Sequence, residues 1–414
     1  MTLAAFRVRS FRFQWSSDLL TSWASEMETV VLGWYVITQS GSVLLLTVFG
    51  SLQYFGTLAA PLFGVLSDRL GGRVLLCAMR SIYAALAALV MLLAAGGWLT
   101  PWWVLAVATI SGFVRPNDLV MRNSLIGETI PPRHLMGALG LSRATMDSAR
   151  VGGALAGAGL STLLGLGLTY AAILTCYLAG LALTFRITRP SPVPDPAAPP
   201  RAASPGRALK AGLARVLSTP ELLALMWLAF LVNLTAYPAS GGLLPYVARE
   251  VYGVGATGLG WLVASFAFGG LLASMVMVVT GGSRRPERAT FACTALWYVV
   301  LLGFGHLQTF GAGAVALLAA GFVQNVAMVS MAATLLSAAG AEFRGRVMGV
   351  RTLAVYGLPL GLMAAGFLIE RVGYAATITA SAAVGLACTL LIGARRRALW
   401  HRPRFGATVG ATDD

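Results

Sequence analysis

The sequence predicts an all-α integral membrane protein with twelve transmembrane helices in two pseudo-symmetric halves of six. Three observations favour this fold class. Of the 414 residues, 57% are hydrophobic and only 11% are charged, which is too apolar for a water-soluble globular protein. The apolar residues occur in stretches of about 20, the length that a helix needs to cross a bilayer. The basic residues gather in every second gap between these stretches.

Twelve apolar stretches, separated by charged or Gly/Pro-rich breaks, are long enough to be membrane helices. The first follows basic residues as a signal peptide would, but it contains Asp18, Glu26 and Glu28 and is too long, so we expect a retained helix. In chain order the stretches cover residues 13–38, 43–66, 74–96, 101–121, 136–164, 166–187, 220–247, 258–280, 288–307, 310–338, 347–369 and 374–394.

A Pro-rich segment divides the stretches into two sets of six. Residues 190–205 read PSPVPDPAAPPRAASP, a composition typical of an extended linker. Glycines of residues 136–160 match those of residues 345–369 at three positions, which favours an internal duplication of the kind found in secondary transporters. We therefore predict an N-terminal half (1–188), a cytoplasmic Pro-rich connector (189–218) and a C-terminal half with a basic tail (219–414).

The loop charges predict the orientation. If both termini lie in the cytoplasm, the basic residues of the outer loops are Arg249 and Arg371, each beside an acid, and the inner loops and the tail hold nearly all the others. This distribution follows the positive-inside rule. It also explains the net charge of +15 without nucleic acid, because no basic run with interleaved aromatic residues occurs. We predict a multi-pass protein of the cytoplasmic (inner) cell membrane.

The sequence lacks the motifs that are typical of several other classes of protein. No G-x-x-x-x-G-K-S/T loop for ATP occurs, and neither H-E-x-x-H nor G-x-S-x-G is present. The four cysteines lie in separate apolar stretches without the paired spacing of a metal or redox site. We therefore expect no enzyme activity, no cofactor and no metal, and energy from an ion gradient.

Residues 64–76 read GVLSDRLGGRVLL, which resembles the signature loop G-x-L-x-D-R-x-G-R-R/K-x-x-L of the major facilitator superfamily. A glycine, Gly72, stands at one of the two basic positions. The resemblance implies a twelve-helix transporter fold. Asp68 with Arg69 and Arg73 is then expected to latch the cytoplasmic ends of the helices in one state, while Gly64 and Gly71 permit close approach.

Three further segments resemble the drug and siderophore exporter branch, which includes macrolide efflux pumps. They are PPRHLMGA at 131–138, RGRVMG at 344–349, and RVGGALAG at 150–157, where Gly153 takes the place of a proline in R-x-x-G-P-x-x-x-G. The resemblance implies a proton-coupled exporter of a hydrophobic or amphipathic small molecule, such as a drug, siderophore or secondary metabolite, that functions as a monomer. Two alternatives remain: a phospholipid or lysophospholipid flippase, and a membrane receptor or sensor without transport.

Ionisable groups inside a membrane helix are functional candidates because their burial is costly. Glu26 lies roughly 20 Å along the helix from Phe13, near mid-membrane, and is our first candidate for proton coupling. Glu28 is the second, on a different face, about 200° around the helix. Alternatively, Glu26 is a permanent partner of Arg115 or Arg150.

Other polar residues are candidates for the cavity or for structure. Asp147 and Arg150, three residues apart, are predicted to form a structural ion pair, and Arg115 and Asp118 have the same spacing. Because Pro116 breaks the helix beside them, substrate contact there is also open. The resemblance places the first, fourth, seventh and tenth helices around a cavity, where the predicted substrate-contacting residues are Arg115, Asn117, Asp118, Asn233, Tyr237, Gln324 and Asn325.

Overall fold

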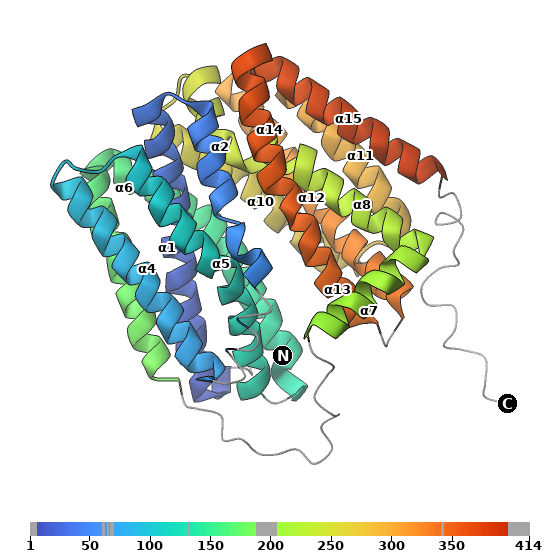
Figure 1. Ribbon diagram of the computed structural model, residues 1–414, viewed down its shortest axis with the longest axis horizontal. Coiled ribbons are helices and arrows are strands. Elements are labelled where there is room, and N and C mark those ends of the chain that lie inside the picture. The colour runs from blue at the N-terminus through green and yellow to red at the C-terminus, as the bar shows by residue number, and fades with distance from the viewer. Residues whose placement is uncertain are drawn as a thin grey trace. The chain divides into compact units, whose positions relative to one another are not determined.

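The computed structural model describes residues 6–59, 63, 66, 70–130, 132–187, 205–340 and 343–395. Within these ranges the chain is helical and contains no strand (Figure 1). The first part contains α1 (Arg9–Ser40), α2 (Val43–Leu52), the 3₁₀ helix η2 (Phe55–Ala59), α4 (Gly72–Ala95), α5 (Pro101–Thr129) and α6 (Pro132–Phe185). The second part contains α7 (Pro205–Ser218), α8 (Pro220–Thr235), η3 (Pro238–Gly242), α9 (Leu244–Tyr246), η4 (Val247–Val251), α10 (Ala256–Thr280), α11 (Pro286–Phe304), α12 (Phe310–Ala339), α13 (Arg344–Leu353), η5 (Ala354–Tyr356), α14 (Gly357–Val372) and α15 (Tyr374–Arg395).

The predicted all-α membrane architecture is confirmed. In the described part of the chain, eight helices are long and apolar enough to cross a membrane. One of these, within α6, is 49 residues long, more than twice the length of a single crossing. The backbone of Gly165 divides it, with φ 72 and ψ 176, a conformation that glycine adopts at little cost. The sequence predicted this break between residues 136–164 and 166–187.

Two predicted helices are interrupted. The second leaves its α-helical path at Leu52 and continues as η2, where Gly56 and Gly112 bring its backbone against that of α5. The seventh is α-helical only to Thr235, after which the wider π-helical segments η3 and η4 follow. Pro238 and Pro245 lie in this region, and proline removes the backbone donor that a regular helix needs.

Backbone contacts divide the chain into two compact units. Unit 1 contains Met1–Ala202 and Gly242–Ala264, and unit 2 contains Ala203–Gly241 and Ser265–Asp414. The predicted connector, residues 189–218, falls partly outside the described residues, and its last part forms α7. The division into halves at 188 and 219 stays a prediction.

Unit 1 is organised around α1 and α6. The two helices pack along one another, and α4 packs against both α6 and α5 (Figure 1). Gly152, Gly153 and Gly157 allow the close approach, because a Cβ atom on each would lie 2.7–2.9 Å from an atom of α1. The apolar core between these helices includes Val36, Ile37, Leu76, Ala87 and Tyr170, all fully buried.

Unit 2 has its own core. In it, α11 packs against α12 and α15, and α8 packs against α14. The central side chains are large and fully buried, among them Trp297, Tyr298 and Leu301. The Tyr298 hydroxyl forms a hydrogen bond of 2.7 Å with the Thr235 hydroxyl, so the polar end of this core residue is satisfied.

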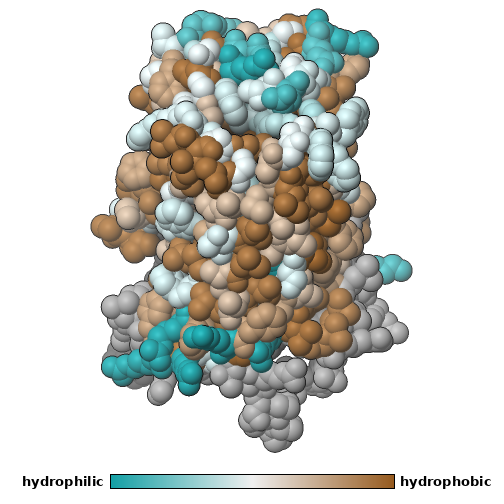
Figure 2. All heavy atoms as spheres, turned by 90° about the vertical axis from the view of Figure 1, so that its left-hand side faces the viewer, coloured by the Kyte–Doolittle hydropathy of each residue, from teal (hydrophilic) through white to brown (hydrophobic). Residues whose placement is uncertain are grey.

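Apolar side chains also cover the outer surface. Figure 2 shows hydrophobic residues across the middle of one face and hydrophilic residues at its two ends. Leu163 and Leu168 of α6 are 81% and 60% exposed. In water such a surface would be unfavourable, whereas lipid tails solvate it.

Candidate functional site

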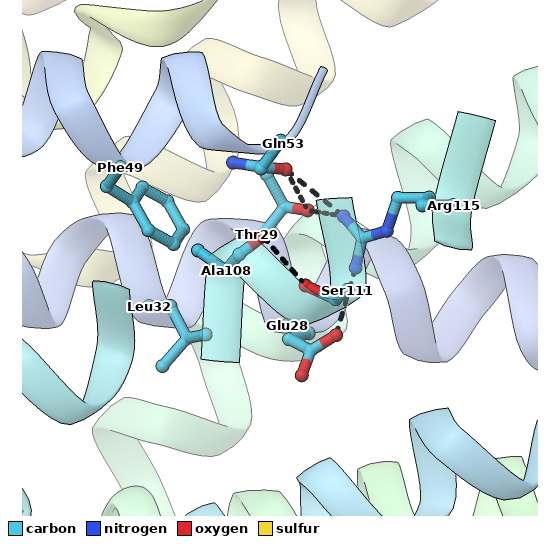
Figure 3. A pocket seen from close by; sticks show the side chains of 8 residues that line it. All are labelled: Glu28, Thr29, Leu32, Phe49, Gln53, Ala108, Ser111 and Arg115. Carbon is cyan, nitrogen blue, oxygen red and sulfur yellow. Dashed lines mark hydrogen bonds and ion pairs between the residues drawn. The ribbon is translucent and has the colours of Figure 1, made fainter. Parts of the chain in front are cut away.

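A pocket in unit 1 lies between α1, the end of α2 and α5. Its cavity is about 10 Å³, room for about one water molecule, within a partly open space of about 190 Å³. Its lining combines apolar and polar side chains (Figure 3): Glu28, Thr29, Leu32, Phe49, Gln53, Ala108, Ser111 and Arg115. Glu28 and Leu32 are one turn apart on α1, and Ala108, Ser111 and Arg115 follow one face of α5. Local helical periodicity thus directs both sets of side chains to one place.

An ion pair forms the polar wall of the pocket. Nη2 of Arg115 lies 2.9 Å from Oε2 of Glu28. Nη1 of the same guanidinium donates to Thr29 at 2.8 Å and to Gln53 at 3.1 Å. The Tyr177 hydroxyl of α6 donates to Oε2 of Glu28 at 3.0 Å. The carboxylate is 5% exposed and the arginine side chain 23%, so the pair is largely removed from water yet borders the cavity.

Protonation of Glu28 would change the charge balance of this pair. A carboxylate that takes up a proton loses its charge and with it the attraction to the guanidinium. Arg115 would then lose its closest charged partner on the wall of the pocket. Because charges are strongly felt where water is scarce, one proton can change both helix packing and ligand preference there.

A second charged cluster lies deeper in unit 1. Arg80 of α4 forms an ion pair with Asp18 of α1, and Arg122 of α5 forms one with Asp118. Nε of Arg122 is also 3.5 Å from Oδ1 of Asp18, which links the two pairs. All four side chains are at most 7% exposed. Uncharged groups complete the cluster: Ser17 and Thr184 accept from Arg80, Ser22 accepts from Arg122, and Gln14 donates to the Arg122 carbonyl.

The two acids predicted for proton coupling lie in different environments. Glu28 lines the pocket, as described. Glu26 is not among the lining residues; its side chain is 31% exposed and lies 3.9 Å from Nε of Arg150. The predicted alternative partner of Glu26, Arg150, is thus the residue that the structure places beside it. Proton coupling itself stays a prediction for both acids.

The charged residues that were predicted to pair within single helices lie beside several partners, and the Asp147–Arg150 pair itself stays a prediction. Asp147 contacts Arg143 at 3.3 Å, and Arg150 contacts Glu26. Arg115 and Asp118, predicted as neighbours, bind Glu28 and Arg122 respectively. For both aspartates the observed spacing is four residues along the helix instead of three. Long arginine side chains reach acids on the next turn or the next helix as easily as those three residues away.

The predicted neutral cavity residues mostly bind backbone or neighbouring helices. Asn117 donates to the carbonyls of Gly56 and Phe113 at 3.1 and 3.0 Å. Asn233 donates to the Ala229 carbonyl within its own helix at 2.8 Å. In unit 2, Gln324 donates to the Tyr237 hydroxyl at 2.6 Å. The Asn117 contact to Gly56 and the Gln324 contact to Tyr237 join separate segments, whereas the Asn233 contact lies within α8. Substrate contact by these residues stays a prediction.

Asn325, the residue after Gln324, was also predicted to contact substrate. Its side chain forms hydrogen bonds with a neighbouring helix. Its amide donates to the carbonyl of Gly270 and to the hydroxyl of Ser274, both at 2.6 Å. Both partners lie in α10, so Asn325 joins α12 to α10. The side chain is 9% exposed.

The predicted signature loop is described only in part. Gly64, Asp68 and Arg69 lie outside the described residues. Gly71 has φ +84, and a Cβ atom there would meet nothing within 4 Å, so the backbone conformation explains the glycine. Arg73 donates a hydrogen bond to the carbonyl of Phe185 in α6. The latch stays a prediction.

Sequence analysis missed Arg80, Arg122, Tyr177 and Gln53. Arg80 is a charge in the middle of the apolar stretch 74–96, the same signal that identified Glu26. Arg122 was assigned to a loop because its charge seemed to end the helix at 121, whereas α5 continues to Thr129. Tyr177 and Gln53 carry no such signal, because neutral polar residues are common in membrane helices.

Comparison with known proteins agrees with the fold. Residues 17–359 match the model of the Major Facilitator Superfamily. No curated protein matches the sequence. Among solved structures, the nucleoside transporter NupG is 12% identical with a TM-score of 0.73, covering 95% of this chain and 100% of that one. A POT family transporter in complex with 5-aminolevulinic acid is 12% identical with a TM-score of 0.71, covering 95% and 97%.

A third structure, the human organic anion transporter MFSD10 (TETRAN), is 16% identical with a TM-score of 0.65, covering 94% of this chain and 99% of that one. At such identities these likenesses concern the fold, the twelve-helix architecture that the sequence predicted. The family match spans most of the chain. The protein therefore belongs to the Major Facilitator Superfamily and is a multi-pass membrane transporter.

Proposed function

We propose that this chain is a proton-coupled secondary transporter that exports a hydrophobic or amphipathic small molecule, with Glu28 as the group that takes up the proton. The observation that carries the proposal is the Glu28–Arg115 ion pair, 2.9 Å long, on the wall of the pocket. An ionisable residue kept inside a membrane protein, where its burial is costly, marks a transport or proton pathway by default.

In this conformation the pocket has room for about one water molecule, and we propose that it widens in another transport state to admit an amphipathic substrate. Leu32, Phe49 and Ala108 offer a wall for an apolar body, and Thr29, Gln53 and Ser111 offer hydroxyl and amide groups for a polar part. Binding sites for small molecules typically combine an apolar lining with a few directed polar groups. The export direction rests on the resemblance to the exporter branch, and the loop charges support an orientation with both termini in the cytoplasm.

Glu28 is a better candidate than Glu26 for two reasons. Its carboxylate lines the pocket, and its partners Arg115 and Tyr177 come from α5 and α6, so protonation would loosen contacts among three helices. The nearest basic partner of Glu26, Arg150, is 50% exposed, so water can replace that weaker pair at little cost.

The test is transport by purified protein in proteoliposomes with an imposed pH difference. The compounds are a macrolide, a catecholate siderophore and a fluorescent amphipathic dye. We expect the wild type to concentrate at least one of them. Glu28→Gln should abolish this accumulation but keep downhill exchange, because glutamine retains the size and the acceptor oxygen. Glu26→Gln is the matched control and should accumulate substrate nearly normally.

Other outcomes would overturn specific parts of the proposal. Undiminished accumulation by Glu28→Gln would remove Glu28 from coupling, and loss in Glu26→Gln alone would transfer that role to Glu26. Flip of a labelled lysophospholipid without transport of any soluble compound would support the flippase alternative. Absence of any flux, with altered gene expression in a deletion strain, would support the sensor.

A further inference from the structure

Helix α7 enters unit 2 at the edge of the membrane. It ends at Ser218, and only Thr219 separates it from Pro220, where α8 and a membrane-spanning segment begin. A helix needs about 1.5 Å per residue, so the last turn of α7 lies within a few ångströms of the start of that segment. The last turns of α7 are therefore held near the boundary between lipid and water.

One face of α7 is covered by protein. Gly212 and Val216, one turn apart, are buried, and a Cβ atom on Gly212 would lie 2.7 Å from the carbonyl oxygen of Arg346 in α13. The helix thus packs closely on α13, and its orientation about its own axis is fixed.

The remaining faces of α7 are amphipathic. Leu213 and Leu217 share a face and are 42% and 60% exposed. At 100° per residue, Arg215 lies about 160° from each leucine, on the opposite side of the helix. Exposed leucines in adjacent turns opposite a cation are unfavourable in water and typical of helices that lie in a membrane surface.

The charged residues of α7 itself are all basic. The sequence of α7, PGRALKAGLARVLS, contains no acidic residue. Lys210 and Arg215 are exposed. The guanidinium of Arg215 lies 5.6 Å from the ring centroid of Phe343, and that of Arg346 lies 5.0 Å from the same ring. Both cations therefore border one aromatic ring at this end of unit 2.

We propose that α7 is a membrane-surface helix that binds the headgroups of anionic phospholipids. Leu213 and Leu217 enter the outer part of the acyl layer, and Lys210, close to them around the helix, extends its apolar stem along that layer to a phosphate. Arg215, on the water side of the helix, and Arg346 beside the same ring add positive charge that attracts an anionic surface. The basic charge and the adjoining membrane segment select anionic lipid over a soluble partner.

Spin labels test the immersion of α7. The four native cysteines are replaced by alanine, and Leu213→Cys, Leu217→Cys and Arg215→Cys each carry a nitroxide in vesicles of equal parts phosphatidylcholine and phosphatidylglycerol. We expect the labels at 213 and 217 to collide mainly with oxygen, which dissolves in lipid, and the label at 215 mainly with an aqueous nickel chelate. Nickel access at all three sites would overturn the proposal, as would spin–spin broadening that shows a second copy covering α7.

Lipid crosslinking tests the charge. A photoreactive phosphatidylglycerol analogue should crosslink to α7, and Lys210→Gln with Arg215→Gln should reduce the yield by about fivefold for each charge removed. The matched control, Arg284→Gln with Arg285→Gln, removes two exposed cations between α10 and α11 and should leave the yield at α7 unchanged. An unchanged yield in the α7 variant would overturn the proposal. Because α7 lies outside the Glu28 pocket, this failure is separate from failure of the transport proposal.

Discussion

Arg80 and Asp18 form an ion pair between α4 and α1 at a depth where the arginine side chain is completely buried. Burying charge in an apolar bundle is costly, so the pair is retained only if each partner is matched. Arg80 also donates to the hydroxyls of Ser17 and Thr184, which places it at the junction of three helices. This junction gives the first prediction.

Arg80→Gln is expected to destabilise the protein by about 3–5 kcal/mol, because it leaves the Asp18 carboxylate without its closest cation. The measurement is the free energy of unfolding in detergent, or the melting temperature. Arg143→Gln is the control: its side chain is 60% exposed and it pairs with Asp147 at the surface of α6, so less than about 1 kcal/mol should be lost. Equal losses in both variants would contradict the importance of burial.

Tyr177→Phe is expected to reduce proton-driven accumulation about tenfold, because the hydroxyl that donates to Glu28 is worth about 1.5–3 kcal/mol as a hydrogen bond to a charged group. Initial rates in proteoliposomes check this. Tyr170→Phe is a matched control on the same helix, since the buried Tyr170 hydroxyl makes no hydrogen bond to any described residue. That variant should transport normally, and a larger loss there than in Tyr177→Phe would refute the assignment.

Gly157→Ala is expected to destabilise the packing of α1 on α6 by about 1–3 kcal/mol, because the new Cβ atom would lie 2.8 Å from Cα of Met27. The atom in the way belongs to the backbone of α1, which cannot shift as easily as the end of a flexible side chain. The control is Gly159→Ala, two residues along α6, where a Cβ atom meets nothing within 4 Å. This change should be neutral or stabilise by up to about 1 kcal/mol through helix propensity. Melting curves of the two variants give the comparison.

Asp68→Asn is expected to reduce transport sharply while membrane insertion stays normal, since the predicted latch needs its negative charge beside Arg69 and Arg73. The described end of the loop supports an anchored structure: Arg73 is tied to the Phe185 carbonyl of α6. Flux and membrane level are measured together in the same cells. Wild-type flux at a wild-type level would show that the loop serves topology only.

Much of the fold could be predicted because membrane helices leave local signals. The starts at Pro101, Phe310 and Tyr374 and the break at Gly165 coincide with proline, glycine or a change in apolar character. The break predicted at Pro116 is wrong, because α5 is continuous from Pro101 to Thr129, and the interruptions of the second and seventh helices were not predicted. The end of α2 at Leu52 depends on a glycine of α5 that is 60 residues away, Gly112, and single-helix patterns carry no such information.

The sequence identified several of the residues that belong to the candidate site, but it did not show which of them form ion pairs with one another. Glu28 and Arg115 were both candidates, but they are 87 residues apart in sequence, so only the packing of α1 on α5 shows that they meet. Arg122 was not recognised as a residue of the membrane bundle for a related reason. A charge normally signals the end of a membrane helix, and it does not do so here because Asp18 and Asp118 neutralise it from within the bundle.

The deeper cluster of unit 1 also has an electrical consequence. Its two carboxylates, Asp18 and Asp118, balance its two guanidiniums, Arg80 and Arg122, and Glu28 balances Arg115. A membrane potential acts on a charge with about 2.3 kcal/mol per 100 mV, but on a neutral group of charges its net work is close to zero. Uptake of one proton by Glu28 would add a single positive charge. The six charges of these pairs would then contribute little net electrical work of their own to the voltage dependence of transport.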